Sequence, residues 1–372
     1  DYYGALLGGA LFAFVLLPFL GLTYTPVLLG SLNLLVASLI LWYFPDHLAR
    51  PRIFKAQFAA LLLVSILAFA VAKPIILYGE QHKYKDKIVY QEQTRYQKIV
   101  VTQWKDDYWL FINGSTQFST YDEERYHEPL VHPLLGLIKE RKDILLLGGG
   151  DGLAAREILK YPDVENLTLV DLDPAMTQLA RQDKIFLSIN KGSLNDPRVR
   201  VINQDAYQFI KNSVDLYDAV IIDLPDPKSV SLSLLYSLGV YKMIENHLKP
   251  FGAMVTQSTS PLYSPEAFLC IKKTLEAAGF STLPYQNSVP SMGQWGWVLG
   301  VRQKAMPAQR LKQDLTALEF ADIKTRFLNR DAMISMAHFG KGLFEKEAQI
   351  EPNTQFDHNI LKYYRQGSWD LY

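Results

Sequence analysis

A single cysteine, Cys270, is present among the 372 residues, so no disulfide can form within the chain. The 38 basic and 38 acidic side chains cancel, which argues against nucleic-acid binding through bulk charge. The seven histidines do not have the spacing of metal ligands, so we expect no metal site. Because no Gly-Lys-Ser or Gly-Lys-Thr loop occurs, the sequence also excludes the usual triphosphate-binding loop.

Charge is almost absent from three apolar stretches near the start of the chain, Gly4–Leu22, Val27–Phe44 and Phe58–Tyr78. Each is close to the roughly 20 residues that a helix needs to cross a bilayer. Tyr and Trp residues lie near their ends, as they do at membrane interfaces. We therefore predict that residues 1–80 are transmembrane helices of a multi-pass protein and the last part of a longer membrane domain. Basic residues flank the third stretch on both sides, so its orientation stays open.

A strand followed by a glycine turn is predicted at Asp143–Gly152, whose sequence is DILLLGGGDG. The glycines, among them Gly148 and Gly150, allow the backbone to turn sharply and to approach a ligand closely. A second apolar run, Leu167–Val170, leads about 20 residues later into Asp171, where an acid can bind a ribose diol. This spacing predicts a nucleotide-binding crevice at the carboxyl ends of parallel strands.

Apolar runs alternate with helical patterns as far as Val301. This alternation predicts an α/β fold, a doubly wound, methyltransferase-like (Rossmann-like) sheet of seven strands. The expected strands are 144–147, 167–170, 198–205, 217–224, 252–259, 280–288 and 295–301, with the last two antiparallel. The expected helices are 153–160, 174–187, 206–212, 232–248 and 265–278. Four acids end strands at the ligand-binding edge: Asp151, Asp171, Asp205 and Asp223.

The remaining segments complete the predicted domain organisation. Residues 87–118 are rich in Tyr and Trp and contain the turn Asn113–Gly114, which is typical of β-hairpins. We divide the chain into four parts: transmembrane helices (1–80), a small β-hairpin domain with a lid (83–140), a Rossmann-like catalytic domain (141–303) and a C-terminal extension (304–372). We assign the extension no chemistry.

The charge of Asp151 indicates which ligand the crevice takes. A carboxylate in the glycine turn would repel phosphate and would favour a cationic ligand. S-adenosylmethionine and its relatives carry adenine, ribose and a positive sulfonium but no phosphate. We therefore expect a sulfonium nucleoside, and a donor of this kind favours a cytoplasmic catalytic domain at the inner cell membrane.

Two further carboxylates, Asp223 and Asp226, follow the fourth strand in the sequence DLPDP. Pro225 and Pro227 restrict the backbone, so this segment is stiff. Beside a cationic nucleoside, such carboxylates can position an ammonium group and then accept its proton, which makes the amine a nucleophile. The structural alternative is that Asp223 caps the next turn and Asp226 is solvated.

The chain resembles the spermidine synthase family of polyamine aminopropyltransferases, and its apolar start resembles the membrane-fused bacterial members. The resemblance runs from about Tyr96 to about Val301 and is carried, in order, by Tyr121–Leu130 (YDEERYHEPL), GGGDG, VDLDP, Gln204–Ala206 (QDA) and DLPDP. One departure is Leu224 and Pro225 inside the last motif, where soluble members usually have small residues. The acceptor pocket is therefore expected to differ from theirs.

The resemblance implies both a reaction and the residues that perform it. An aminopropyl group passes from decarboxylated S-adenosylmethionine, a co-substrate and not a tightly bound cofactor, to an amine such as putrescine. Methylthioadenosine leaves and a spermidine-like product forms. The catalytic residues are then Asp223, as the base, and Tyr126. The donor-binding residues are Gln97, Gly148, Gly150, Asp151, Asp171 and Asp205, and the acceptor-binding residues are Asp226, His127, Gln257 and Tyr285.

Three alternatives stay open at this point. A methyltransferase that uses intact S-adenosylmethionine would share the sheet and the ribose acid, although Asp151 would repel the carboxylate of that donor. A non-catalytic membrane module could sense nucleosides or polyamines. An aminopropyltransferase could also act on a membrane-associated amine. The expected partners are a small amine, the lipid bilayer and a second copy of the chain in a dimer.

Overall fold

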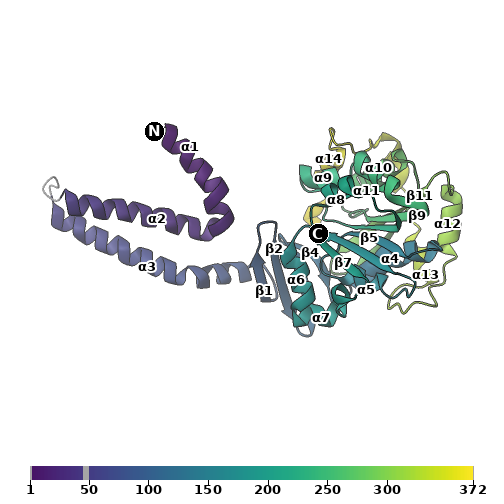
Figure 1. Cartoon of the computed structure of the whole chain (residues 1–372), viewed down its shortest axis with the longest axis horizontal. Coiled ribbons are helices and arrows are strands. Elements are labelled where there is room, and N and C mark those ends of the chain that lie inside the picture. Colours follow the sequence, from purple (N-terminus) through teal and green to yellow (C-terminus); the bar gives the residue numbers. More distant parts are fainter. Residues whose placement is uncertain (1, 45–49, 372) are drawn as a thin grey trace. The chain divides into compact units, whose positions relative to one another are not determined.

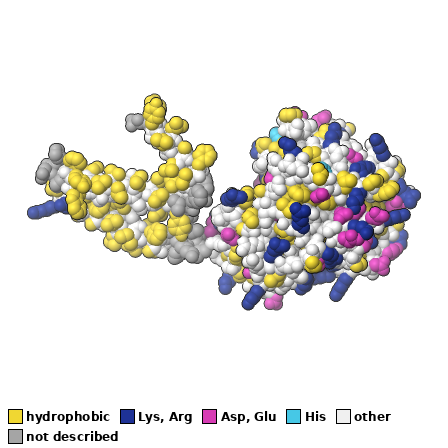
Figure 2. All heavy atoms as spheres, viewed as in Figure 1, with side chains coloured by type: hydrophobic (Ala, Val, Ile, Leu, Met, Phe, Trp, Pro, Cys, Tyr) yellow, Lys and Arg dark blue, Asp and Glu magenta, His cyan; other side chains and the backbone are white. Residues whose placement is uncertain are grey.

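The computed structural model describes the backbone of residues 2–44 and 50–371, with their side chains apart from those of 17–23, 72–78 and 371. The chain divides into two compact units, Asp1–Val89 and Tyr90–Tyr372. Each unit has its own surface character. Figure 2 shows hydrophobic side chains over much of the described surface of the first unit, and Lys, Arg, Asp and Glu scattered over the second.

The first unit consists mainly of apolar helices (Figure 1). These are α1 (Tyr2–Leu11), the π-helical segment η1 (Phe12–Leu16), α2 (Leu17–Tyr43) and α3 (Pro51–Gln81). Large apolar side chains such as Leu32 and Leu61 are more than half exposed, at 59% and 58%. A water-soluble protein rarely exposes so many apolar side chains together. The helices therefore have the surface expected of segments that face lipid or further protein.

Within the described residues, two helical segments are long and apolar enough to cross a membrane, Tyr24–Tyr43 and Pro51–Val71. The remaining apolar helix of this unit, Tyr2–Leu16, is shorter, and because the side chains of residues 17–23 are not described, the predicted span Gly4–Leu22 stays a prediction. The Thr25 hydroxyl donates to the Leu16 carbonyl (3.3 Å), although a straight helix would hold these residues about 13 Å apart, so α1 and α2 are not one straight span. The side chains of 17–23 and 72–78, at the ends of the first and third predicted stretches, lie outside the described residues.

A small sheet follows the helices, with the strand order β1-β2-β3-β4. Its strands are β1 (Lys87–Gln93), β2 (Lys98–Trp104), β3 (Asp107–Ile112) and β4 (Ser115–Ser119). The β3–β4 turn has positive φ at both Asn113 (52°) and Gly114 (81°), which is the geometry of the predicted hairpin turn. The Thr94 hydroxyl, in the β1–β2 turn, donates to the Asp173 carboxylate at 2.8 Å and so links this sheet to the larger one.

The larger sheet has the seven strands that the sequence predicts, in the order β10-β11-β9-β8-β5-β6-β7. The strands are β5 (Asp143–Gly148), β6 (Asn166–Asp171), β7 (Val199–Asn203), β8 (Tyr217–Asp223), β9 (Leu248–Gln257), β10 (Phe280–Val289) and β11 (Gly293–Arg302). Five neighbouring strands of the sheet are parallel, in the spatial order β7, β6, β5, β8 and β9. The strand β11 then pairs antiparallel with β9, and β10 pairs antiparallel with β11. The doubly wound fold is therefore confirmed.

Two hydrophobic clusters cover the two faces of this sheet, because alternate residues of a strand point to opposite sides. Along β5, Ile144 and Leu146 belong to one cluster, whereas Leu145 and Leu147 belong to the other. The first face carries α4 (Glu124–Leu137), α5 (Leu153–Ile158), α6 (Pro174–Gln182), α12 (Ala308–Thr316) and α13 (Arg330–Met336). The second face carries α8 (Ala206–Asn212), α10 (Leu238–His247), α11 (Pro265–Ala277) and α14 (Asn359–Arg365).

Two helices that the sequence predicts as continuous are each divided in the structure. The segment 174–187 forms α6 and α7 (Lys184–Asn190), because Asp183 is extended and its carboxylate accepts the Ile185 N–H as the N-cap of α7. Likewise 232–248 divides into α9 (Val230–Leu235) and α10, and the Ser237 side chain caps α10. Short polar side chains that satisfy helix-terminal N–H groups thus override a helical hydrophobic pattern.

Candidate active site

The predicted site residues lie at the carboxyl ends of the parallel strands. Gly148 ends β5, Asp171 ends β6, Asp223 ends β8 and Gln257 ends β9. Gly148 pairs with Asp223 across adjacent strands, so the glycine turn and the DLPDP segment begin side by side. This edge is where doubly wound sheets bind ligands.

The glycine turn leaves no room for side chains at two of its positions. Gly148 has a φ of +84°, and a Cβ atom there would lie 2.0 Å from the Asp223 carbonyl oxygen. A Cβ atom on Gly150 would lie 2.5 Å from Oδ2 of Asp171. The Gly150 N–H instead donates to that oxygen at 3.1 Å. The glycines therefore allow the turn to lie against both neighbouring strands.

Asp151 and Asp171 are held by backbone N–H groups. Oδ1 of Asp151 accepts the Leu153 N–H at 2.8 Å, and Oδ1 of Asp171 accepts the Asp173 N–H at 2.9 Å. Burial raises the pKa of Asp151, partly offset by the nearby charge of His127. Burial likewise raises the pKa of Asp171 to about 6, against the hydrogen bonds from Asp173 and Gly150. Both carboxylates would gain from a cationic or hydroxyl-bearing ligand.

Tyr126 and Asp223, the two predicted catalytic residues, are directly hydrogen-bonded. The Tyr126 hydroxyl donates to Oδ1 of Asp223 at 2.7 Å. Burial raises the pKa of Asp223 to about 6, although the charge of His127 and the bond from Tyr126 act in the opposite direction. A carboxylate with such a pKa is ionised at neutral pH and is a stronger base than one in water.

The buried His127 imidazole pairs with Glu123 close to these carboxylates. Its Nδ1 lies 3.1 Å from Oε2 of Glu123, and Arg156 Nη2 lies 2.8 Å from each oxygen of the same Glu123 carboxylate. Burial alone would lower the pKa of His127, but the hydrogen bond and charge of Glu123 raise it to about 9. The protonated imidazole offsets part of the repulsion between Asp151 and Asp223.

Asp226 is buried beside neutral hydrogen-bond donors. Its Oδ2 accepts the Tyr364 hydroxyl at 2.9 Å, and its Oδ1 lies 3.5 Å from Nε2 of Gln257. Gln257 Nε2 also donates to the Leu224 carbonyl (2.7 Å), and the Tyr236 hydroxyl donates to the Pro225 carbonyl (3.1 Å). Burial raises the pKa of Asp226, partly offset by Lys228 and by the bonds from Tyr364 and Gln257. These contacts add to the restriction that Pro225 and Pro227 place on the backbone of the DLPDP segment.

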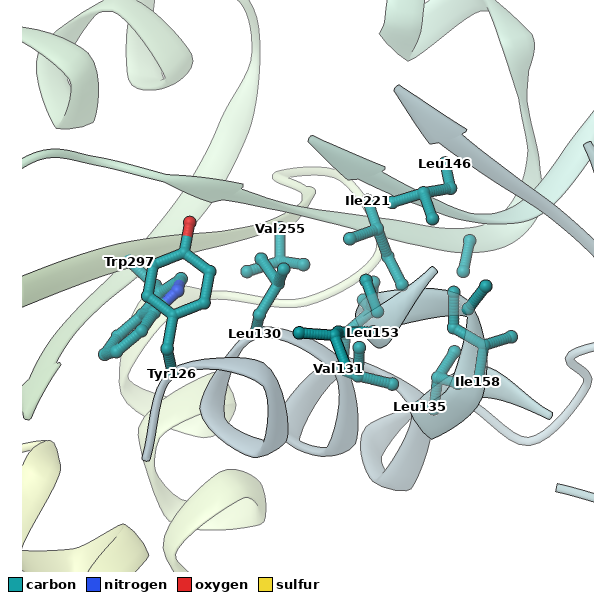
Figure 3. Close-up of a cluster of buried hydrophobic side chains, with 14 of the residues drawn as sticks. Tyr126, Leu130, Val131, Leu135, Leu146, Leu153, Ile158, Ile221, Val255 and Trp297 are labelled. Atoms are coloured by element: carbon teal, nitrogen blue, oxygen red, sulfur yellow. The ribbon is translucent and has the colours of Figure 1, made fainter. Parts of the chain in front are cut away.

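Aromatic rings surround the Tyr126 side chain. Figure 3 shows Tyr126 beside Trp297 near the start of α4, while Leu130 and Val131 of the same helix reach the hydrophobic cluster. The ring centroids of Tyr126 and Trp297 are 5.4 Å apart, and those of Tyr126 and Trp295 are 6.4 Å apart. Such rings give a cation an electron-rich, water-poor surface.

Three predicted site residues have other surroundings. Tyr285 is fully buried, stacks on Trp297 (centroids 5.7 Å apart) and donates its hydroxyl to the Pro129 carbonyl at 2.8 Å. This geometry supports a core role for Tyr285 and not acceptor binding. Asp205 is exposed and accepts the Gln208 N–H at 2.9 Å as the N-cap of α8. Gln97 lies in the β1–β2 turn that Thr94 joins to Asp173.

The sequence predicts no function for four residues that lie beside the site: Glu123, Arg156, Tyr236 and Tyr364. The four-residue spacing of Glu123 and His127 in the sequence is a signal that could have revealed this pair. Tyr364 has no comparable signal, because it lies 138 residues from Asp226 and in the segment to which we assign no chemistry.

Comparison with known proteins identifies the family. The family model described as "Spermine/spermidine synthase domain" matches residues 123–314. The chain is 39% identical over 375 residues to a "Polyamine aminopropyltransferase" of Oceanobacillus iheyensis, an alignment that covers all of this chain and 71% of that protein. It is 40% identical over 370 residues to "Polyamine aminopropyltransferase 2" of Ralstonia nicotianae, covering 98% of this chain and 71% of that protein.

Solved structures share the fold. "Crystal Structure of Spermidine Synthase in Complex with Transition State Analogue AdoDATO" aligns with a TM-score of 0.63 at 22% identity and covers 71% of this chain and 89% of that one. The spermidine synthase of Thermotoga maritima aligns with a TM-score of 0.61 at 22% identity. The chain therefore belongs to the spermine/spermidine synthase family of polyamine aminopropyltransferases.

Proposed function

We propose that this aminopropyltransferase uses decarboxylated S-adenosylmethionine as its donor and a putrescine-like diamine as its acceptor. The observation that carries the proposal is the 2.7 Å hydrogen bond from Tyr126 to Asp223 at the carboxyl edge of the sheet. A structural neighbour is described in complex with the transition-state analogue AdoDATO, which is consistent with a donor of this class.

The donor site consists of the glycine turn, Asp151 and Asp171. Asp171 binds the ribose hydroxyls, and Gly148 and Gly150 let the backbone approach the nucleoside. Asp151 binds the primary amine of the aminopropyl group through a charge-assisted hydrogen bond. The raised pKa of Asp151 supports this role, because a carboxylate kept dry by burial gains most when an ammonium group arrives.

Deprotonation of the acceptor is the step assigned to Asp223. An alkylammonium has a pKa near 10, so the acceptor arrives protonated and without a lone pair. Oδ1 of Asp223 accepts the Tyr126 hydroxyl, and Oδ2 accepts no hydrogen bond from the part of the chain that the structure describes. Oδ2 therefore takes the proton from the ammonium group. The Tyr126 bond keeps the carboxylate oriented while this happens.

Bond formation then follows with balanced charge. The neutral amine attacks the carbon next to sulfur, the new C–N bond forms, and the C–S bond breaks with its electrons passing to sulfur. Methylthioadenosine leaves as a neutral thioether, and the product retains a secondary ammonium. Orientation of the amine by Asp223 and of the donor by Asp151 supplies much of the rate.

Asp226 binds the second ammonium group of a diamine. Asp226 is 9% exposed, accepts a hydrogen bond from the Tyr364 hydroxyl and lies 3.5 Å from Nε2 of Gln257. Both of these partners are neutral. Each carboxylate oxygen has two lone pairs, so the group retains capacity for an ammonium. A monoamine would lack this contact, which favours diamines as acceptors.

Mass spectrometry of the products tests the proposal directly. The protein is incubated with decarboxylated or intact S-adenosylmethionine and a panel of amines. Methylthioadenosine together with an aminopropylated diamine should form only with the decarboxylated donor. A methylated amine and S-adenosylhomocysteine from the intact donor would instead establish the methyltransferase alternative.

The helices α2 and α3 support a membrane location for the enzyme. We propose that Tyr24–Tyr43 and Pro51–Val71 cross the inner membrane. We further propose that the second unit, Tyr90–Tyr372, which we call the catalytic unit, is cytoplasmic. Fractionation tests this location, because a spanning protein stays in the membrane pellet at alkaline pH whereas a peripheral one is released. Protease added to spheroplasts should leave the catalytic unit intact if it is cytoplasmic.

A further inference from the structure

The C-terminal segment reaches the acceptor side of the site through one hydroxyl group. Tyr364 belongs to α14, outside the residues 123–314 that match the family model. Its hydroxyl donates to Oδ2 of Asp226 at 2.9 Å, and its side chain is 6% exposed. A buried tyrosine hydroxyl on a buried carboxylate is a specific arrangement, because each group would be costly to bury without the other.

Other contacts fix the Tyr364 side chain in this position. The Trp369 indole N–H donates to the Tyr364 carbonyl at 2.7 Å, and the two rings lie 4.5 Å apart between centroids. The Ser368 N–H donates to the Tyr263 carbonyl at 2.7 Å. Tyr263 belongs to the segment that follows β9 and Gln257. The terminal turn is therefore anchored to the same strand end that carries Gln257.

A buried asparagine anchors the start of the same segment. Asn353 has no exposed surface, and its Nδ2 donates to the Ser233 carbonyl of α9 at 2.7 Å. The main-chain carbonyl of Asn353 accepts the Leu238 N–H at 2.8 Å, and its side-chain Oδ1 accepts the Ile360 N–H of α14 at 3.3 Å. Asn353 thus joins α14 to the helices that follow the DLPDP segment.

From these contacts we infer that Tyr364 is a positioning residue for acceptor binding and that the C-terminal segment forms one wall of the acceptor site. This inference rests on the proposed role of Asp226 as the ligand of the second ammonium group. Tyr364 does not take part in the transfer step. It orients the Asp226 carboxylate and stabilises its ionised form, so that an ammonium group finds a fixed, charged partner.

The test compares Tyr364→Phe with the parent enzyme on two amines of equal chain length, 1,4-diaminobutane and n-butylamine. Loss of one hydrogen bond to a charged group should raise the KM for the diamine about 10-fold. The kcat and the donor affinity should change little. The KM or inhibition constant of n-butylamine should stay unchanged, since a monoamine places no charge at Asp226.

The control variant is Tyr363→Phe on the same helix, because the Tyr363 hydroxyl accepts the Glu351 N–H at 3.2 Å and does not contact Asp226. It should leave both amines unaffected. In an Asp226→Ala background, Tyr364→Phe should add nothing to the KM, since the group through which it acts is gone.

Each contrary result has a distinct meaning. An unchanged diamine KM in Tyr364→Phe, with a raised KM in Asp226→Ala, would overturn the inference and leave the proposed function intact. Equal losses for both amines together with a lower Tm would assign Tyr364 a purely structural role and also overturn it. An unchanged diamine KM in Asp226→Ala would refute the proposed acceptor site itself.

Discussion

The Tyr126 hydroxyl donates a 2.7 Å hydrogen bond to Asp223 although the two residues lie 97 positions apart in the chain. Tyr126 lies in the first turn of α4 on one face of the sheet, and Asp223 ends β8, the fourth of the seven strands in the sheet. Their contact joins an acid of raised pKa to a group that orients it.

Replacement of the base should lower turnover strongly without affecting the donor site. Asp223→Asn keeps the shape of the side chain but cannot accept a proton, so kcat should fall about 100-fold or more. Stopped assays of methylthioadenosine release measure kcat, and calorimetry measures donor affinity. Asp215→Asn, an exposed acid just before the same strand, is the matched control and should behave like the parent. Normal turnover by Asp223→Asn would mean that the proton leaves by another route.

The same substitution should stabilise the fold in a pH-dependent way. The pKa of Asp223 is about 6 in the folded protein, whereas an unperturbed aspartate has a pKa of 3.8, so its ionisation opposes folding at neutral pH. Below pH 4 the carboxyl is protonated in both states and Asp223→Asn should have no effect. The stabilisation should grow between pH 4 and pH 6 and reach about 1–3 kcal/mol above pH 6. Urea denaturation at several pH values checks this, and a stabilisation that is constant with pH would contradict the assignment.

The choice of donor should depend on Asp151. Asp151→Asn removes a charge-assisted hydrogen bond to the donor amine, so affinity for decarboxylated S-adenosylmethionine should fall about 10-fold or more. Affinity for the intact donor should fall less or improve, because a repulsion with its carboxylate disappears. Calorimetric titration with both donors provides the comparison. Unchanged binding of the decarboxylated donor would restore the methyltransferase interpretation.

A buried carboxylate outside the site should be needed for stability. Glu128 follows His127 on α4 and accepts three backbone N–H groups, from Arg326 (2.6 Å), Phe327 (2.9 Å) and Leu328 (2.7 Å). Glu128→Gln replaces an anion by an amide that cannot accept all three, so the free energy of unfolding should drop by about 2–3 kcal/mol. Glu124→Gln, one turn earlier, is the control: burial raises the pKa of Glu124 and its Oε2 lies 3.5 Å from Arg326, so removal of its charge should not lower stability. Equal effects of the two variants would contradict the special role of Glu128.

The catalytic unit should not need the helices for its fold. Residues 81–372 include both sheets and every predicted site residue, so this shortened chain should be soluble without detergent. It should also bind the donor as the full chain does. Circular dichroism and donor titration test both points. A shortened chain that aggregates or loses donor binding would mean that the helices help to stabilise the catalytic unit.

Much of the fold follows from local patterns. The seven strands, the hairpin turn at Asn113–Gly114 and the glycine turn at Gly148 are readable from the sequence because each depends on neighbouring residues and their periodicity. The helix breaks at Asp183 and Ser237 are less readable, because a single capping side chain competes there with an otherwise helical pattern.

Part of the site can likewise be predicted from the sequence, and part of it cannot. The acids at strand ends could be placed on one edge from sequence alone, because parallel strands put their carboxyl ends together. The surroundings that set their chemistry could not be placed. Glu123 raises the pKa of His127, and the Tyr364 hydroxyl donates to Asp226 from a position 138 residues away. Tyr285 is buried in the core, where its hydroxyl donates to the Pro129 carbonyl. Burial and contacts between distant segments depend on how the helices pack on the sheet, and these decide pKa values and hydrogen-bond partners. The sequence by itself therefore determined which groups are available at the edge of the sheet, and the tertiary structure decided which of them meet.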